Sequence, residues 1–189
     1  MGAAVRAAGG DYINPDELAR DLRAASPASS VTEANAAAGL KGKEQLEHVI
    51  ANRGQYAFET TLGRKTISQL LAAAIAAGLE VHVLYVGLAS PEQHIARVRA
   101  RVARGGHDIP EAKIRERYDG SRKNLIRLMA QLTSLRVFDN SFEAPPEKGA
   151  APQPVELFGV TSGVLRVHVP PDQMPDWAKP LFMAALSKG

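Results

Sequence analysis

The sequence predicts an α/β fold in which a mostly parallel sheet carries helices on both faces. Short apolar runs alternate with longer stretches of helical periodicity, which is the pattern of strand–helix–strand units. Only 5% of the 189 residues are aromatic while alanine is plentiful, and this favours helices packed closely on a sheet over a β-sandwich. The length suits a single domain that spans residues 1–189.

Composition and charge exclude several classes of protein. The chain has no cysteine, which excludes a disulfide scaffold, a thiolate zinc site and a cysteine nucleophile. The 23 basic residues exceed the 20 acidic residues by only three, so a nucleic-acid surface would need local clustering of charge. No apolar run approaches the roughly 18 residues that span a bilayer, and the start lacks the apolar core of a signal peptide. We therefore expect a cytoplasmic protein without a membrane partner.

Helix-start signals organise the first half of the chain. Asn14-Pro15-Asp16-Glu17 has Asn at the N-cap, Pro at the first helical position and Glu where a capping box needs it. Ser30-Val31-Thr32-Glu33 is a second candidate capping box. Together with the apolar periodicity, these signals predict strands at 12–13 and 56–59, and helices at 15–24, 31–52 and 64–77.

The second half contains the clearest strand. Val81 to Leu88 is almost continuously apolar, as expected of a strand that is covered on both faces. The other predicted strands are 136–139 and a hairpin of 155–160 with 164–169, and the predicted helices are 91–104, 110–132 and 176–186. Residues 143–154 have the proline-rich composition of a linker loop.

Two carboxylates follow predicted strands in the first half of the chain. Asp16 comes after the first strand and Glu59 after the second. Ligands of parallel sheets bind at the carboxyl ends of the strands, where a carboxylate can accept a proton from a substrate hydroxyl or hold a sugar hydroxyl. From the pattern alone, an acid favoured by the helix dipole in a first turn is the preferred interpretation of Asp16, and Glu59 could equally cap the next helix. The pattern alone leaves these alternatives open.

Basic residues concentrate between Arg97 and Arg127. Arg97, Arg101 and Arg104 share one helix face, and Gly105-Gly106 then lets the chain turn back. Arginines on both arms of such a hairpin indicate a mobile lid over an anion. A solvated basic face is the competing interpretation, whereas nucleic-acid binding is disfavoured because aromatic residues are scarce in this stretch. The five histidines show no spacing typical of a metal site.

Six short segments resemble the zeta-toxin-type P-loop kinases in order and spacing, from about residue 11 to 141. They are Tyr-Ile-Asn-Pro-Asp-Glu-Leu-Ala (12–19), Phe-Glu-Thr-Thr-Leu-Gly-Arg (58–64), Ser-Pro-Glu (90–92), Gly-Gly-His-x-Ile-Pro-Glu (105–111), Ile-Arg-x-Arg-Tyr (114–118) and Asp-Asn-Ser (139–141). The C-terminal Pro-Asp-Trp-Ala (175–178) also resembles small bacterial members. The resemblance implies a P-loop-kinase-like fold.

The resemblance further implies ATP-dependent transfer of a phosphoryl group, with Mg²⁺, to a hydroxyl of a UDP-N-acetyl sugar such as UDP-N-acetylglucosamine. An antitoxin protein would be a candidate partner. By this resemblance Asp16 is the catalytic base, and the acceptor contacts are Glu59, Thr60, Thr61 and Arg64. Arg104 and Arg117 would neutralise the transferring group. Arg101, Arg115 and Asn140 would bind the nucleotide.

One departure from the family pattern concerns the phosphate-binding loop. The family opens with a strand and a Walker A loop, G-x-x-x-x-G-K-[ST], whose amides and lysine cradle phosphates. The sequence contains no such loop. The two segments that partly resemble it are Gly42-Lys43 and Gly63-Arg64-Lys65-Thr66, and both lack the required spacing. We expect ATP affinity and catalysis to be impaired. Either the natural start lies upstream, or the chain is a non-catalytic remnant that binds a nucleotide sugar or another anion.

Overall fold

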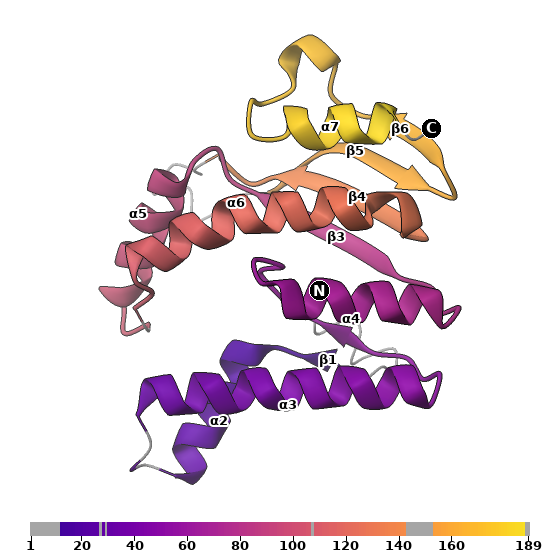
Figure 1. Ribbon diagram of the computed structural model, residues 1–189. Coiled ribbons are helices and arrows are strands. Elements are labelled where there is room, and N and C mark those ends of the chain that lie inside the picture. The colour runs from indigo at the N-terminus through magenta and orange to yellow at the C-terminus, as the bar shows by residue number, and fades with distance from the viewer. Residues whose placement is uncertain (1–11, 27, 29, 107, 143–152, 188–189) are drawn as a thin grey trace. The chain divides into compact units, whose positions relative to one another are not determined.

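The computed structural model describes residues 12–26, 28, 30–106, 108–142 and 153–187 (Figure 1). It confirms a mixed α/β protein that contains parallel strands. The chain divides into two compact units. The N-terminal unit holds the residues up to Thr61 and Lys65–Leu79, and the C-terminal unit holds Leu62–Arg64 and the residues from Glu80 onward. The single-domain organisation stays a prediction. No helix in the described ranges has the length and apolar character to cross a membrane.

The N-terminal unit contains a short parallel strand pair and three helices. β1 (Tyr12–Ile13) pairs with β2 (Ala57–Phe58), with Tyr12 opposite Ala57. The helices are α2 (Pro15–Ala25), α3 (Val31–Ala51) and α4 (Lys65–Ala76). The predicted capping box at the start of α3 is confirmed, because Ser30 accepts from the Glu33 amide and Glu33 accepts from the Ser30 amide.

Alanines allow α2 and α3 to pack closely. Ala19 of α2 is buried against Ala34 and Ala38 of α3, with Leu18 and Leu22 at the border of this cluster. Small side chains let two helix backbones approach each other, so this contact packs α2 against α3.

The C-terminal unit contains a four-stranded sheet in the order β3-β4-β5-β6. β3 (His82–Gly87) and β4 (Ser134–Asp139) are parallel, whereas β5 (Val155–Thr161) and β6 (Val164–Val167) form the predicted hairpin and are antiparallel. The hairpin turns at Ser162 and Gly163, whose φ angles of 49° and 78° are those of a type I′ turn. We expected one mostly parallel sheet, but the structure contains two: the parallel pair of β1 and β2, and the sheet of β3 to β6. The second sheet is mixed because the antiparallel hairpin strands extend the parallel pair of β3 and β4.

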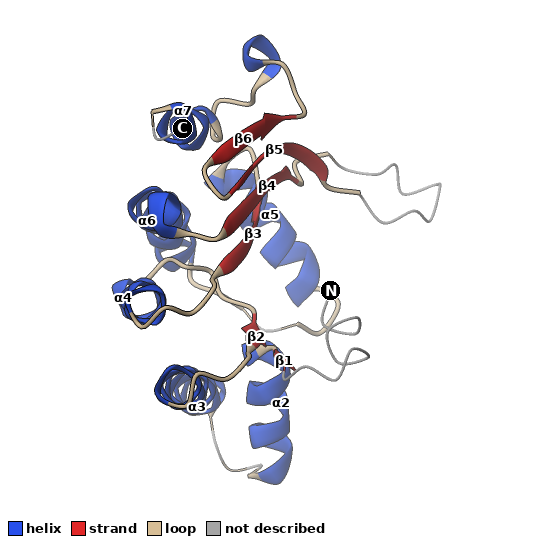
Figure 2. Cartoon of the chain, turned by 90° about the vertical axis from the view of Figure 1, so that its right-hand side faces the viewer, coloured by secondary structure: helices blue, strands red, loops and turns tan. Residues whose placement is uncertain are grey.

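Helices cover the sheet of the C-terminal unit unequally. They are α5 (Pro91–Val102), α6 (Glu111–Leu128), the short 3₁₀ helices Met129–Gln131 and Pro171–Gln173, and α7 (Lys179–Leu186). Figure 2 shows α6 and α7 on one side of this sheet and α5 toward the other. The most deeply buried side chains lie beneath α6 and α7, namely Leu125, Leu135, Val137, Phe158 and Leu181. α7 begins later than predicted, because Pro180 is accepted only in a first helical turn.

We predicted that β3 is covered on both faces. Within the part of the chain that the structure describes, this prediction is wrong. Tyr85 faces α6, where its hydroxyl bonds to Ser121 at 2.8 Å. On the opposite face, Leu84 and Val86 are 41% and 51% exposed. The predicted linker falls mostly on residues 143–152, which lie outside the described residues.

Candidate functional site

Glu59 lies at the carboxyl end of the parallel pair in the N-terminal unit. Its amide donates to the Ile13 carbonyl at 3.2 Å, which continues the pairing of β1 and β2 by one residue. The Tyr12 hydroxyl donates to one carboxylate oxygen, and Asn14 Nδ2 donates to the other at 3.1 Å. The residue is nevertheless exposed. A carboxylate that is oriented from two sides and open to solvent can accept a hydrogen bond from a ligand hydroxyl.

Tyr12 remains a hydrogen-bond donor to Glu59 over the whole physiological pH range. Partial burial of the ring, the hydrogen bond to Glu59, and the negative charges of Glu59 and Glu17 raise the pKa of Tyr12 to about 12. A protonated phenol beside a carboxylate fixes the direction of the hydrogen bond. The phenol therefore stays the donor of this hydrogen bond around neutral pH.

Asn14 connects the start of α2 to Glu59. Its Oδ1 accepts from the Glu17 amide at 3.3 Å, which confirms the predicted N-cap, while its Nδ2 holds Glu59. Asp16 lies in the first turn of α2, but its side chain is outside the described part of the structure, so its role as base stays a prediction. Thr60 and Thr61 are exposed in the segment that follows β2.

The segment Leu62–Arg64 is fixed on α6 within the C-terminal unit. Leu62 is buried and has a φ of 51°. The buried amide of Asn124 donates to the Leu62 carbonyl at 2.8 Å and approaches the Arg64 carbonyl at 3.4 Å. Gly63 lies against the stem of Arg117, where an added Cβ would be 2.8 Å from Arg117 Cγ. The backbone at Arg64 is thus held by α6, while the Arg64 side chain is exposed.

The positive charges of three arginines act on His94 of α5. Burial, and then the positive charges of Arg101, Arg97 and Arg117, lower the pKa of His94 below its ordinary value. Arg101 and Arg117 were both predicted to contact the anion, and they come from the two arms of the predicted lid, α5 and α6. We call Arg97, Arg101 and Arg117 the arginine cluster. Its concentrated positive charge can bind an anion.

The loop after β4 lies beside the arginine cluster. Arg97 Nη2 donates to the Asn140 carbonyl at 2.7 Å. Asp139 is 5% exposed and accepts from the Ser141 amide and hydroxyl and from Trp177 Nε1 at 3.2 Å. Asn140 Oδ1 is buried and has no hydrogen-bond partner among the described residues.

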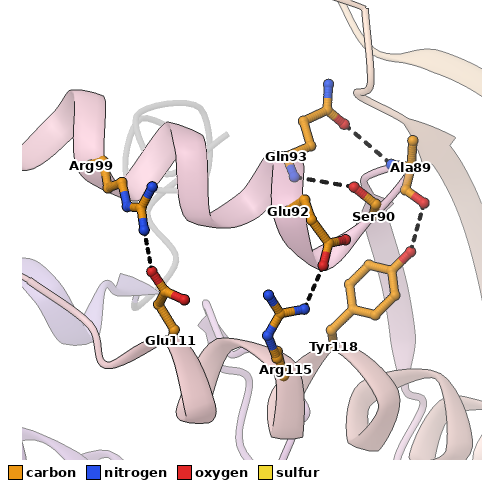
Figure 3. A network of polar contacts seen from close by, with 8 residues as sticks. All are labelled: Ala89, Ser90, Glu92, Gln93, Arg99, Glu111, Arg115 and Tyr118. Atoms are coloured by element: carbon orange, nitrogen blue, oxygen red, sulfur yellow. Dashed lines mark hydrogen bonds and ion pairs between the residues drawn. The ribbon is translucent and has the colours of Figure 1, made fainter.

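The remaining arginines of the predicted lid have other partners. Figure 3 shows Arg115 of α6 paired with Glu92 of α5, and Arg99 paired with Glu111. The hydrogen bond from Arg115 lowers the pKa of Glu92. Arg104 is exposed and its Nε donates to the Ala100 carbonyl at 3.2 Å. Arg104 and Arg115 are therefore not among the charges that lower the pKa of His94.

The glycine pair between α5 and α6 closes the end of α5. Gly106 donates to the Arg101 carbonyl at 3.0 Å and Gly105 to the Val102 carbonyl at 2.9 Å, which is the Schellman pattern. Gly105 has a φ of 87°, a conformation that favours glycine. The predicted turn is confirmed, and these glycines have a clear local role in ending the helix.

Sequence reasoning missed three residues that orient the site. Tyr12 and Asn14 were assigned to a strand and a cap, although both also hold Glu59. Asn124 was not noticed, although it fixes the Arg64 segment. The sequence could have shown Asn124 as a polar residue on the buried face of α6, next to Leu125 and one turn before Leu128. A buried amide needs hydrogen-bond partners, so such a residue is expected to hold another segment in place.

The described residues of the C-terminal unit supply positive charge. Positive charge of this kind can attract an anionic group such as a phosphate. In the part of the chain that the structure describes, no three acidic or histidine side chains gather closely enough to hold a metal ion. Mg²⁺ is usually bound by one or two carboxylates together with waters and phosphates.

Comparison with known proteins finds a relative in Haemophilus influenzae. An uncharacterized protein from Haemophilus influenzae is 31% identical over 106 residues, an alignment that covers 56% of this chain and 73% of that protein. No family model matches the chain. No solved structure matches it either.

Proposed function

We propose that this chain, which belongs to the same family as the Haemophilus influenzae protein, is a zeta-toxin-like phosphotransferase that recognises a UDP-N-acetyl sugar. The observation that carries the proposal is the exposed Glu59 carboxylate, which Tyr12 and Asn14 hold at the carboxyl end of β1 and β2. The proposed reaction transfers the γ-phosphate of ATP to a hydroxyl of the sugar.

The N-terminal unit would recognise the acceptor. Glu59 accepts a hydrogen bond from a sugar hydroxyl, and its two donors keep the carboxylate in position before the ligand binds. Such preorganisation lowers the cost of binding. Asp16 is proposed as the base that takes the proton of the attacking hydroxyl, and Thr60 and Thr61 as further acceptor contacts.

The C-terminal unit would recognise anionic groups. Phosphoryl transfer depends mainly on positioning and on positive charge around the phosphates. The arginine cluster supplies that charge, and Arg64, on a segment held by Asn124, is a further candidate contact to the acceptor. Asn140 is proposed to accept from the nucleotide base.

Changing Glu59 to Gln tests acceptor recognition. Gln keeps the size of the side chain but removes the charge and one acceptor oxygen, so affinity for UDP-N-acetylglucosamine should fall at least about tenfold, as for the loss of a charge-assisted hydrogen bond. Isothermal titration calorimetry measures the change. Glu44→Gln, an exposed glutamate of α3, is the matched control and should bind as the unaltered chain does. Equal affinity in both variants would remove Glu59 from the site.

ATP binding should raise the pKa of His94. Burial, and then the positive charge of the arginine cluster, lower this pKa. Polyphosphate bound at the cluster would neutralise its charge and favour the imidazolium. The measurement is an NMR pH titration of the histidine rings with and without ATP, with His94→Gln to assign the signal. In Arg101→Ala the ATP-dependent rise should shrink. A His94 signal indifferent to saturating ATP would argue against anion binding at this cluster.

A second candidate is a non-catalytic protein that binds a nucleotide sugar. It would keep the recognition of the sugar by Glu59 and of anionic groups by the arginine cluster without catalysing transfer. Assaying this chain for transfer from radiolabelled ATP to UDP-N-acetylglucosamine separates the two functions. Transfer that Asp16→Ala abolishes supports the enzyme, whereas binding that depends on Glu59 without transfer supports the binding protein.

A further inference from the structure

Arg64 and Arg117 are neighbours because the segment that contains Arg64 packs directly on α6. An added Cβ on Gly63 would lie 2.8 Å from Arg117 Cγ and 3.0 Å from Arg117 Cα. An added Cβ on Gly120, about one turn further along α6, would lie 2.6 Å from the Gly63 carbonyl oxygen. Arg64 follows Gly63 in the chain, and both arginines belong to the C-terminal unit. Two positively charged side chains therefore start from adjacent backbone positions.

Within the described residues, the charged side chains around Arg117 form salt bridges, whereas Arg117 and Arg64 form none. Every charged residue between positions 111 and 122 of α6 other than Arg117 has such a partner. The pairs are Arg99 with Glu111, Lys113 with Glu116, Arg115 with Glu92, and Arg122 with Asp119. Each pair is neutral as a whole, so the surplus positive charge of this stretch comes from Arg64 and Arg117.

Glu116 is the acidic residue whose charge acts on both arginines. It precedes Arg117 on α6, and its carboxylate accepts a hydrogen bond from Lys113 Nζ at 2.7 Å. That hydrogen bond and the charge of Lys113, followed by the charges of Arg64 and Arg117, lower the pKa of Glu116. The carboxylate is therefore ionised at neutral pH. Its side chain is 57% exposed, so a ligand that binds Arg64 and Arg117 meets this negative charge.

We propose that Glu116 makes the anion site at Arg64 and Arg117 prefer a diphosphate diester, the linkage of a nucleotide sugar, over a nucleotide that ends in a terminal phosphate. This inference rests on the proposed function, which assigns Arg64 to the acceptor. Each phosphate of the diester carries a single negative charge, whereas a terminal phosphate carries about −1.5 to −2 at pH 7. The two guanidinium groups therefore balance the charge of the diester without a surplus.

Repulsion from a fixed carboxylate grows with the charge of the ligand. Glu116 therefore weakens the binding of every phosphate ligand, but it weakens the binding of UDP or UTP more than that of UDP-N-acetylglucosamine. Proteins obtain specificity in this way when they place a like charge against the unwanted ligand. The consequence for a phosphotransferase is that ATP, which has a terminal phosphate, competes less well for the place of the acceptor.

Replacing Glu116 by glutamine should raise ligand affinity by a factor that increases with ligand charge. For a partly screened contact we expect roughly a twofold gain for each unit of ligand charge, which gives about fourfold for UDP-N-acetylglucosamine, about eightfold for UDP and about sixteenfold for UTP. Isothermal titration calorimetry in low-salt buffer without added metal ions measures the three dissociation constants. The gains should shrink in about 0.5 M salt, because dissolved ions screen the carboxylate.

Glu47→Gln is the matched control for the change in net charge. Glu47 of α3 also pairs with a lysine of its own helix, Lys43 at 2.9 Å, and its side chain is 45% exposed. This variant should leave all three dissociation constants unchanged. Arg64→Gln should weaken the binding of all three ligands, because they would lose one of the two guanidinium groups. Circular dichroism confirms that each variant is folded.

The inference is overturned if the gain in Glu116→Gln is equal for the three ligands, if Glu47→Gln gives the same gains, or if Arg64→Gln binds all three as the unaltered chain does. Absence of UDP and UTP binding from every variant would also overturn it. The proposed function fails by a different result, namely Glu59→Gln binding UDP-N-acetylglucosamine as tightly as the unaltered chain. UDP and UTP lack the sugar, so the charge series would still test Glu116 in that case.

Discussion

Replacing Phe158 by alanine is expected to lower the free energy of unfolding by about 3–5 kcal/mol, the cost of truncating a buried aromatic side chain. Phe158 is fully buried in β5 and packs edge-to-face on Phe182 of α7, with ring centroids 5.5 Å apart and an interplanar angle of 63°. It also lies opposite Val137 of β4 and Val167 of β6. The truncation therefore leaves a cavity between three strands and a helix.

Thermal and urea denaturation followed by circular dichroism measure this effect. For a chain of this size each kcal/mol corresponds to roughly 2–4 °C, so the midpoint should fall by about 6–20 °C. Val155→Ala, an exposed position of the same strand, is the matched control and should cost only about 0.5 kcal/mol. A loss below about 1 kcal/mol for Phe158→Ala would mean that the surrounding core closes over the cavity.

Replacing Gly120 by alanine should destabilise the protein by about 1–3 kcal/mol, as for overpacking of a tight contact. A Cβ at this position of α6 would lie 2.6 Å from the Gly63 carbonyl oxygen. A backbone atom cannot rotate aside as a flexible side chain can. The Leu62–Arg64 segment must move away from α6, which strains the 2.8 Å hydrogen bond from Asn124 to the Leu62 carbonyl.

Replacing Gly39 by alanine is expected to have the opposite effect and to stabilise the protein. Gly39 lies within α3, and an added Cβ meets nothing within 4 Å. Alanine there should stabilise the helix by up to about 1 kcal/mol through helix propensity. Urea midpoints of the two variants give the comparison. If both glycine changes stabilise the protein, the close approach of Gly120 to Gly63 is not a feature of the folded state.

Local sequence signals predicted the helices well. Ser30 with Glu33, and Ser90 with Pro91, mark helix starts because the capping hydrogen bonds join residues only three positions apart. The Ser162-Gly163 turn of the hairpin is equally local. Such signals involve neighbours along the chain, so they can be interpreted without knowledge of tertiary packing.

Features that depend on distant residues could not be predicted in the same way. Tyr12 and Glu59 are 47 positions apart, and Asn124 and Leu62 are 62 apart, so no local pattern joins them. Leu62 adopts a positive φ without being glycine. The apolar run of β3 indicates a strand, but it does not show whether other elements cover Leu84 and Val86.

The position of Trp177 gives the molecule a built-in optical reporter. It is the only tryptophan of the chain, it is 5% exposed, and its indole donates to Asp139 at the end of β4. Its fluorescence therefore follows the C-terminal unit alone, whereas far-ultraviolet circular dichroism follows the helices of both units. Coincident transitions by the two signals would indicate one cooperative folding unit, and separated transitions two.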